Sequence, residues 1–264
     1  MDVVGCYSPT WCQELIPMRR QRSAVQEQPA VNDLGKSNEH GFKTSENEEW
    51  FEVHSSAVTN TNPGSMVYVN IDTTPICPNM TYREFRQTIL SLRDDALEAI
   101  QQRRNELAVW SPSAQERVRA WFGSADDAIR QKLITGLTAL ARVMTGLTAT
   151  NFVRPDPDRD RAVGCTPNTK NLGEVAHVCR PDTATHTIAI DTNFCQLPQK
   201  SAGKLSSMQL TLVHECTHFV DTFGTLDYPN AYGRTACTWF ARDHSNLAIN
   251  NADSIAWYVL AHDE

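Results

Sequence analysis

The 264-residue chain has little that would indicate a polyanionic partner or a membrane. Its net charge is −7 at pH 7, and no run of Lys or Arg is longer than the pairs Arg19-Arg20 and Arg103-Arg104. It has no apolar stretch of roughly 18 residues, the length that suggests a membrane-spanning helix. The segment Met1–Cys6 lacks a basic region and a long apolar run, so no secretory signal peptide is expected. These absences predict no nucleic-acid partner and no membrane span.

The cysteines lack the spacing of a structural zinc site, because none of the eight forms a C-x-x-C pair. Their even number is typical of proteins that fold in an oxidising compartment. We therefore expect disulfides in a protein that is secreted or exported as an effector without a signal peptide. We expect Cys216 to be either a small buried hydrophobic residue or the partner of Cys237.

The composition predicts two regions. Residues 1–70 are polar and rich in Gln, Asn, Ser and Glu, which is typical of an extension that cannot bury a core. This extension is interpreted as a linker, pro-segment or targeting region that could bind a delivery partner or inhibit the domain after it. One apolar stretch within it, 66–71, is expected to form a strand. Residues 71–264 are expected to form the folded domain.

The folded domain is predicted to be α+β and mostly helical. Apolar residues recur every three or four positions through 82–147, which predicts helices. Two prolines and a lack of apolar residues predict a loop at 154–161. The segments 176–178 and 186–190 are predicted to pair as a small hairpin, and 252–260 to form a final helix.

The most informative motif is the H-E-x-x-H sequence His214 to His218, which lies in an apolar segment. In a helix, residues four apart share one face, so both imidazoles can bind one Zn²⁺ while Glu215 lies beside the water that the ion activates. A buried carboxylate without a partner costs several kcal/mol, so Glu215 needs such a neighbour. The motif therefore predicts a zinc metallopeptidase.

A catalytic zinc site typically needs a third protein ligand. The extended motif H-E-x-x-H-x-x-G-x-x-H is excluded, because Asp221 and Gly224 occupy its glycine and third histidine positions. A glutamate from a later helix is not expected as the third ligand, because only Glu264 follows His218. The remaining downstream candidates are Asp221, Asp227, Asp243, Asp253, Asp263, His244 and His262.

Asp227 stands out among these candidates. It follows Gly224-Thr225, a turn that can end the zinc helix and bring the chain back beneath the metal. Tyr228 and Tyr232 come shortly after it, and a phenol can stabilise an oxyanion.

At these residues the chain resembles the aspzincin metallopeptidases, the family of deuterolysin and the fungal peptidyl-lysine metalloendopeptidases. The family pattern, H-E-x-x-H followed by G-T-x-D-x-x-Y-G, is represented by His214–His218, Gly224–Asp227 and Tyr232-Gly233. Four residues rather than two separate Asp227 from Tyr232, so Tyr228 is an alternative phenol. The resemblance extends to Ile188–Cys195 and Asn251–Ser254, and weakly back to about Cys77.

The resemblance implies a zincin-like domain whose small sheet or hairpin lines the cleft and which hydrolyses peptide bonds in proteins. One Zn²⁺ per chain would be held by His214, His218 and Asp227. Glu215 would act as general base and Tyr232 would stabilise the oxyanion. It also implies two disulfides, Cys77 with Cys165 and Cys179 with Cys195.

Substrate preference is implied by the same resemblance. In the peptidyl-lysine members, an acidic residue at the position of Asp253 faces the substrate side chain that follows the scissile bond. The resemblance therefore predicts a preference for Lys or Arg at that substrate position. The family's second acidic residue, three positions later, is Ala256 here. Asp253 could instead cap the last helix or hydrogen-bond to a metal ligand.

Two other functions are compatible with the motif. An effector or toxin would use the same chemistry on a specific protein of a target cell. A non-catalytic zinc-binding module would normally have lost Glu215 or a ligand, and neither is lost here.

Overall fold

The computed structural model describes residues 74–167 and 173–261, together with the backbone of four short strands before Thr74. The chain divides into two compact units, Met1–Thr74 and Pro75–Glu264. In the first unit, β1 (Val3–Val4) pairs antiparallel with β4 (Val67–Tyr68), and β2 (Leu15–Met18) pairs antiparallel with β3 (Glu49–Glu52). β4 lies within the strand predicted at 66–71. The rest of the predicted extension lies outside the described residues.

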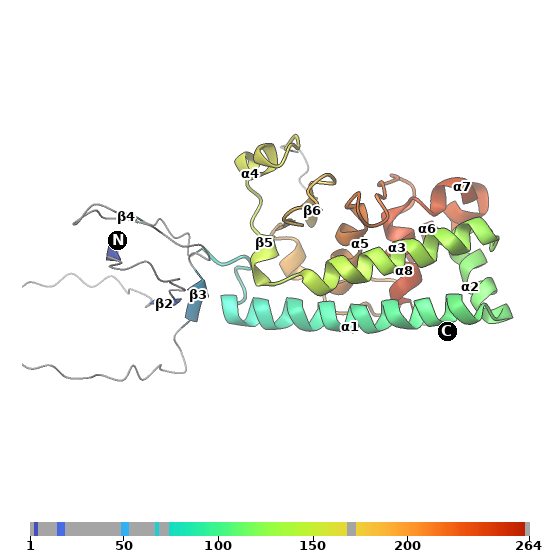
Figure 1. The fold of residues 1–264 in the computed structure, drawn as a ribbon, viewed down its shortest axis with the longest axis horizontal. Coiled ribbons are helices and arrows are strands. Elements are labelled where there is room, and N and C mark those ends of the chain that lie inside the picture. Colours follow the sequence, from blue (N-terminus) through green and yellow to red (C-terminus); the bar gives the residue numbers. More distant parts are fainter. Residues whose placement is uncertain are drawn as a thin grey trace, which may run out of the picture. The chain divides into compact units, whose positions relative to one another are not determined.

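Three helices open the second unit, as the apolar periodicity predicts. They are α1 (Tyr82–Val109), α2 (Pro112–Phe122) and α3 (Asp127–Gly146). Each begins at a residue whose side chain accepts a hydrogen bond from the first turn: Thr81, Ser111 and Asp126, respectively. α1 and α3 lie along each other (Figure 1), which buries their apolar stripes.

A three-stranded sheet follows the helices, with strand order β5-β7-β6. The predicted hairpin is confirmed as β6 (Ala176–Val178) and β7 (Ile188–Ile190), which pair antiparallel. β7 begins only at Ile188, and His186 before it has φ +46°, outside the extended region. β5 (Phe152–Val153) joins β7 in parallel and was not predicted, because two residues carry no periodicity.

The prediction of a loop at 154–161 is wrong in part, because the structure forms a short helix there, α4 (Pro157–Ala162). The side chain of Asp156 caps its first turn, and Pro157 occupies a first-turn position that needs no backbone N–H donor. Single 3-10 turns lie at Ala149–Asn151 and Phe194–Gln196.

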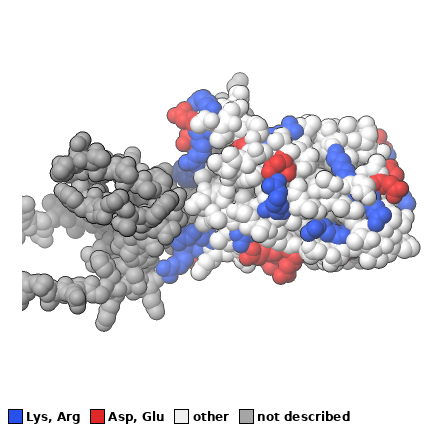
Figure 2. All heavy atoms as spheres, viewed as in Figure 1, with Lys and Arg blue, Asp and Glu red and all other residues white. Residues whose placement is uncertain are grey.

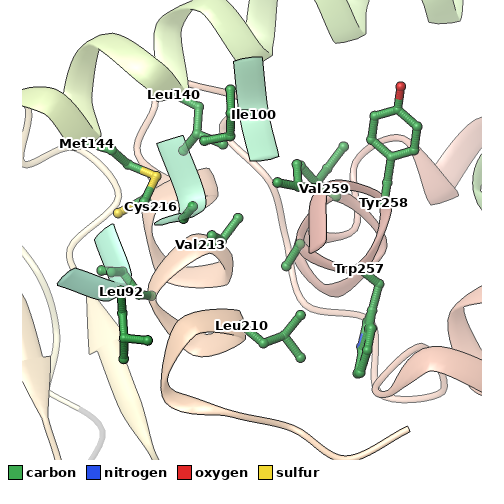
Figure 3. Close-up of a cluster of buried hydrophobic side chains, with 14 of the residues drawn as sticks. Leu92, Ile100, Leu140, Met144, Leu210, Val213, Cys216, Trp257, Tyr258 and Val259 are labelled. Atoms are coloured by element: carbon green, nitrogen blue, oxygen red, sulfur yellow. The ribbon is translucent and has the colours of Figure 1, made fainter. Parts of the chain in front are cut away.

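The final helices are α5 (Met208–His218), α6 (Arg234–Asp243), α7 (Ser245–Ala248) and α8 (Ala252–Leu260). Every residue of α5 is buried, because this helix packs against α1, α3 and α8. Figure 3 shows the apolar cluster that surrounds it. The labelled members of this cluster are Leu92, Ile100, Leu140, Met144, Leu210, Val213, Cys216, Trp257, Tyr258 and Val259. The H-E-x-x-H helix is thus held on several sides by the core.

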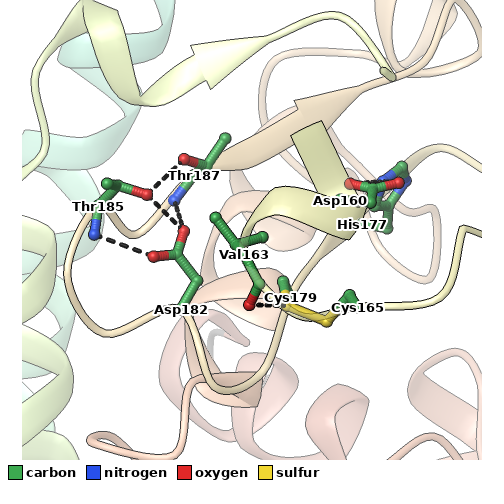
Figure 4. The surroundings of a disulfide bond; sticks show 8 residues. All are labelled: Asp160, Val163, Cys165, His177, Cys179, Asp182, Thr185 and Thr187. Atoms are coloured by element: carbon green, nitrogen blue, oxygen red, sulfur yellow. Dashed lines mark hydrogen bonds and ion pairs between the residues drawn. A yellow bond between two sulfur atoms is a disulfide. The ribbon is translucent and has the colours of Figure 1, made fainter. Parts of the chain in front are cut away.

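The disulfide pairing implied by the resemblance is wrong. The structure joins Cys77 to Cys195, with Cα atoms 5.5 Å apart, and Cys165 to Cys179, with Cα atoms 5.8 Å apart. The chain after β7 returns to the start of α1, where the Asn79 side chain donates to the Cys195 carbonyl at 3.1 Å. Cys165 follows α4 and lies beside the end of β6 (Figure 4). The disulfide partners are therefore the cysteines whose Cα atoms the fold brings to within 5.5 and 5.8 Å of each other.

Cys216 and Cys237 are both buried and free, so the first expectation for Cys216, a small buried hydrophobic residue, is confirmed and the alternative pairing with Cys237 is wrong. Burial raises the pKa of the Cys216 thiol, which keeps it protonated as a small hydrophobic residue. No helix within the described residues is long and apolar enough to cross a membrane. On the face drawn in Figure 2, basic and acidic side chains are interspersed without a continuous patch of one sign. The mostly helical fold with a small sheet confirms the predicted fold class.

Candidate active site and metal centre

His214, His218 and Asp227 come together at the C-terminal half of α5. The two Nε2 atoms are 3.2 Å apart. Asp227 Oδ1 lies 3.2 Å from Nε2 of His214, and Asp227 Oδ2 lies 3.4 Å from Nε2 of His218. Within residues 74–167 and 173–261, this is the only set of three such side chains able to hold one metal ion.

These distances fit a tetrahedral zinc site. Ligand atoms of a tetrahedron are separated by about 1.6 times the bond length, or about 3.3 Å for zinc bonds of about 2.0–2.1 Å. The 3.2 Å separation of the two Nε2 atoms matches that edge, and Asp227 places one oxygen 3.2 Å from Nε2 of His214 and the other 3.4 Å from Nε2 of His218. Two imidazoles and one carboxylate are also a donor set that Zn²⁺ takes in catalytic sites.

The far nitrogens of both imidazoles are engaged by the protein. His214 Nδ1 donates to Asp253 Oδ1 at 2.8 Å, and His218 Nδ1 donates to the Thr225 carbonyl at 3.1 Å. These bonds direct each Nε2 toward Asp227 and fix the tautomer that a metal ligand needs. Thr225 is fully buried, and its hydroxyl lies 2.7 Å from that of Thr217 on α5.

The turn after α5 brings Asp227 into place. Gly224 has φ +61°, a conformation that residues with a Cβ rarely adopt. Thr225 N–H donates to the Thr217 carbonyl at 3.1 Å. Leu226 N–H donates to the Asn250 carbonyl at 2.8 Å, and the Leu226 carbonyl accepts from Ala252 N–H at 3.1 Å. Asp227 thus follows a backbone segment tied to both the zinc helix and the start of α8.

Asp253 lies behind His214, and both of its oxygens are engaged. Oδ1 accepts from His214, and Oδ2 accepts from the Gly233 N–H at 2.5 Å. The suggestion that Asp253 caps the last helix is wrong, because Asn251 is the N-cap of α8. The alternative, a hydrogen bond to a candidate metal ligand, is the contact that the structure forms, and its partner is His214. Asp253 also lines the cleft, so its contact with substrate stays a prediction.

Of the two candidate phenols, Tyr232 is the one beside His214. Its ring stacks on His214 with centroids 6.1 Å apart, whereas Tyr228 packs against Phe240 at 5.2 Å. Tyr232 lines the cleft and is 52% exposed, so a substrate can reach it. Partial burial and the neighbouring Asp227 raise the pKa of Tyr232, which keeps its O–H available as a donor.

Glu215 opens into a cleft of about 600 Å³, whose lining includes α5 on one side and the edge strand β6 on another. Burial raises the pKa of the Glu215 carboxyl, and the adjacent imidazoles act against that rise. Burial also opposes charge on His214, but hydrogen bonds with Asp227 and Asp253 outweigh it and raise the His214 pKa to about 10. The pKa of Asp227 is lowered: burial opposes this shift, but hydrogen bonds with both histidines prevail. The site therefore favours positive charge where Zn²⁺ would bind.

A second polar cluster, which the sequence did not reveal, lies on the β6 side of the same cleft. Glu174 Oε1 is 2.8 Å from His177 Nδ1, and His177 Nε2 is 3.4 Å from Asp160 Oδ2. Arg180, just after β6, donates to the Gly224 carbonyl at 2.8 Å. No motif joins these residues, and only the strand pattern of 176–178 pointed to this part of the cleft.

Comparisons with known proteins agree with the geometry. The family model of the aspzincins, described as lysine-specific metallo-endopeptidase, matches residues 108–260, which is more than half of the chain. Among solved structures, a zinc peptidase from Grifola frondosa is similar in fold, with a TM-score of 0.50 and 20% sequence identity. The similarity covers 66% of this chain and 93% of that one. A search of curated proteins found no significant match.

Proposed function

Because this chain belongs to the aspzincin family and is a zinc metalloendopeptidase, we propose that His214, His218 and Asp227 hold one catalytic Zn²⁺ per chain. The observation that carries this assignment is the close approach of the three donor groups beside Glu215, whose candidate ligand atoms lie within 4.8 Å of one another. The ion would polarise the scissile carbonyl and lower the pKa of a water molecule toward about 7. The non-catalytic alternative has no support, since the family is enzymatic.

We assign Glu215 as the general base. It lies next to His214 on α5, is buried, and lines the cleft. Its carboxylate would accept a proton from the attacking water and pass it to the leaving amine. The burial that raises its pKa makes its carboxylate a stronger base toward the attacking water.

Tyr232 and β6 would bind the reacting peptide. The phenol of Tyr232 would donate to the oxyanion that forms on the scissile carbonyl. β6 is at the edge of its sheet, and the Val175 carbonyl accepts from Asp191 N–H on the β7 side at 3.0 Å. Because backbone groups alternate in antiparallel pairs, those of Ala176 and Val178 face away from β7. An extended substrate could add to that edge.

The substrate is a protein or peptide, and we propose a preference for Lys or Arg after the scissile bond. Asp253 lines the cleft but is occupied by His214 and Gly233, and Ala256 offers no second carboxylate. We therefore give Asp253 mainly the role of positioning His214. The two disulfides are compatible with an extracellular protein, and secretion or export as an effector is the destination we propose. Residues 1–70 would act as an inhibitory or delivery segment.

The test is to load wild type and Glu215→Gln with zinc and measure metal content and cleavage of unfolded casein. We expect chelator-sensitive cleavage by wild type. The variant should bind the same amount of zinc and lose activity by several orders of magnitude, because only the proton acceptor is removed. Substantial turnover by the metal-loaded variant would rule out Glu215 as the base.

A further inference from the structure

We propose that the substrate cleft is charge-polarised along β6. Glu174, before the strand, would bind a basic side chain of the substrate, and Arg180, after the strand, would bind an acidic one. The scissile bond would lie between them. This inference rests on the proposed function, because it names the peptides that the same site would take.

Glu174 is suited to a cationic side chain. It lines the cleft, and its side chain is 15% exposed. The Asn193 side chain donates to its backbone carbonyl at 3.0 Å, and His177 holds Oε1. Within the described residues, no hydrogen bond or ion pair engages Oε2. Burial and the nearby Glu215 raise the pKa of Glu174, so a cation would relieve the cost of its charge.

Arg180 is suited to a carboxylate. It lines the other end of the same segment of the cleft and is exposed. Its carbonyl accepts from Val220 N–H at 3.0 Å, and one guanidinium nitrogen donates to Gly224 at 2.8 Å. These bonds fix it beside the turn that leads to Asp227. Within the described residues, the other guanidinium nitrogens have no protein partner, and a guanidinium matches a carboxylate in geometry and charge.

The separation between Glu174 and Arg180 suits a short extended peptide. The seven residues from Glu174 to Arg180 are joined by six steps that span at most about 20 Å, and a bound strand would cover that length with about five to seven residues. The strand between them is anchored, because Cys179 is disulfide-bonded to Cys165 and His177 contacts Asp160 (Figure 4). Glu174 and Arg180 are therefore both attached to a segment that the disulfide and the His177 contact hold in place.

Other carboxylates of the cleft are less able to select a basic side chain. Glu215 and Asp227 are assigned to proton transfer and zinc binding. Both oxygens of Asp253 already accept hydrogen bonds. Among the carboxylates of the described cleft lining, this leaves Glu174 as the one with an unengaged oxygen and no assigned role in the reaction.

The test uses the zinc-loaded full chain and a peptide library with charged residues on either side of the cleaved bond. Wild type should prefer Lys or Arg on one side and Asp or Glu on the other, about five to seven residues apart. We then measure the ratio of kcat/KM for matched peptides carrying Lys or Met at the preferred position. Glu174→Gln should lower this ratio about tenfold, as expected for loss of a charged hydrogen bond. Arg180→Gln should do the same for the ratio of Glu to Gln peptides.

The double variant Glu174→Arg with Arg180→Glu should reverse the order of the preferred charges, an effect that structural damage would not produce. Glu98→Gln on α1 and Arg119→Gln on α2, both exposed, are matched controls and should leave both ratios unchanged. The proposed charge polarisation of the cleft would be contradicted if wild type showed no charge preference, or if the preferences were unchanged in the Gln variants. A wild type that binds no zinc or cleaves nothing would instead contradict the proposed function.

Discussion

Gly136, a glycine on α3 outside the active site, allows a test of how the fold positions the site residues. Gly136 lies on α3 beneath the ring of Phe223, the residue before Gly224. A Cβ at position 136 would lie 2.2 Å from Cε1 and 2.4 Å from Cζ of that ring, whereas ordinary contacts are 3.4–4 Å. In Gly136→Ala, the ring must therefore move by more than about 1 Å. Its movement would disturb the turn that carries Thr225 and Asp227.

Two opposing effects set the change in stability. Alanine stabilises a helix by about 1 kcal/mol relative to glycine, whereas overpacking costs about 1–3 kcal/mol. We expect Gly136→Ala to lower the free energy of unfolding by about 0–2 kcal/mol. The larger effect should be on zinc, because the Thr225 carbonyl orients His218 and Asp227 is the proposed third ligand. We expect zinc affinity to fall about tenfold or more, as when partners that orient a ligand are lost.

Gly146→Ala is the matched control, because it lies on the same helix and an added Cβ would meet no heavy atom within 4 Å. Its stability should be equal or slightly higher, within about 1 kcal/mol, with unchanged zinc affinity. Urea unfolding and competition for zinc with a chromogenic chelator measure both quantities. Equal stability and zinc affinity in the two variants would refute the argument that Phe223 transmits the strain to the site.

Further predictions concern charge and pH. Asp253→Asn should weaken zinc binding about 10- to 100-fold in the same chelator assay, because His214 loses its charged partner; unchanged affinity would contradict that role. Zinc binding at pH 7 should release a proton, since His214 with a pKa of about 10 is protonated there, and affinity should rise from pH 7 toward 10. Calorimetry in two buffers of different ionisation enthalpy checks this, and identical heats would contradict it. Burial alone would raise the pKa of Asp182, but hydrogen bonds from Thr185 and Thr187 outweigh burial and lower it. Ionised Asp182 therefore stabilises the folded state above the unfolded pKa of about 3.9, and this stabilisation is lost as the pH falls through the folded pKa. Asp182→Ala should therefore cost about 1–3 kcal/mol at pH 7 and less at pH 3 in urea unfolding, and an equal loss at both would exclude this linkage.

Local patterns predicted the features that depend on neighbours in the chain. The helices through 82–147 follow from apolar periodicity, and α5 follows from the apolar setting of His214 and His218. Asp227 was identified because Gly224 can adopt the positive φ that ends the helix and returns the chain.

Long-range contacts could not be predicted from local sequence patterns. Disulfide partners depend on which turns the sheet brings together, so Cys77 was paired wrongly. Glu174 and His177 lie 14 and 17 residues from Asp160 without a shared motif, and Arg180 contacts a turn 44 residues away. Only the folded cleft unites these residues.

The most direct test of the metal centre is the zinc content of purified wild type, Asp227→Ala and Asp243→Ala by mass spectrometry. Asp243 is an exposed aspartate at the end of α6 and serves as the control. We expect one zinc per chain in wild type and in Asp243→Ala, and little or none in Asp227→Ala, together with loss of chelator-sensitive casein cleavage. Full zinc content in Asp227→Ala, or no zinc in wild type, would contradict the assignment of His214, His218 and Asp227 as the catalytic site.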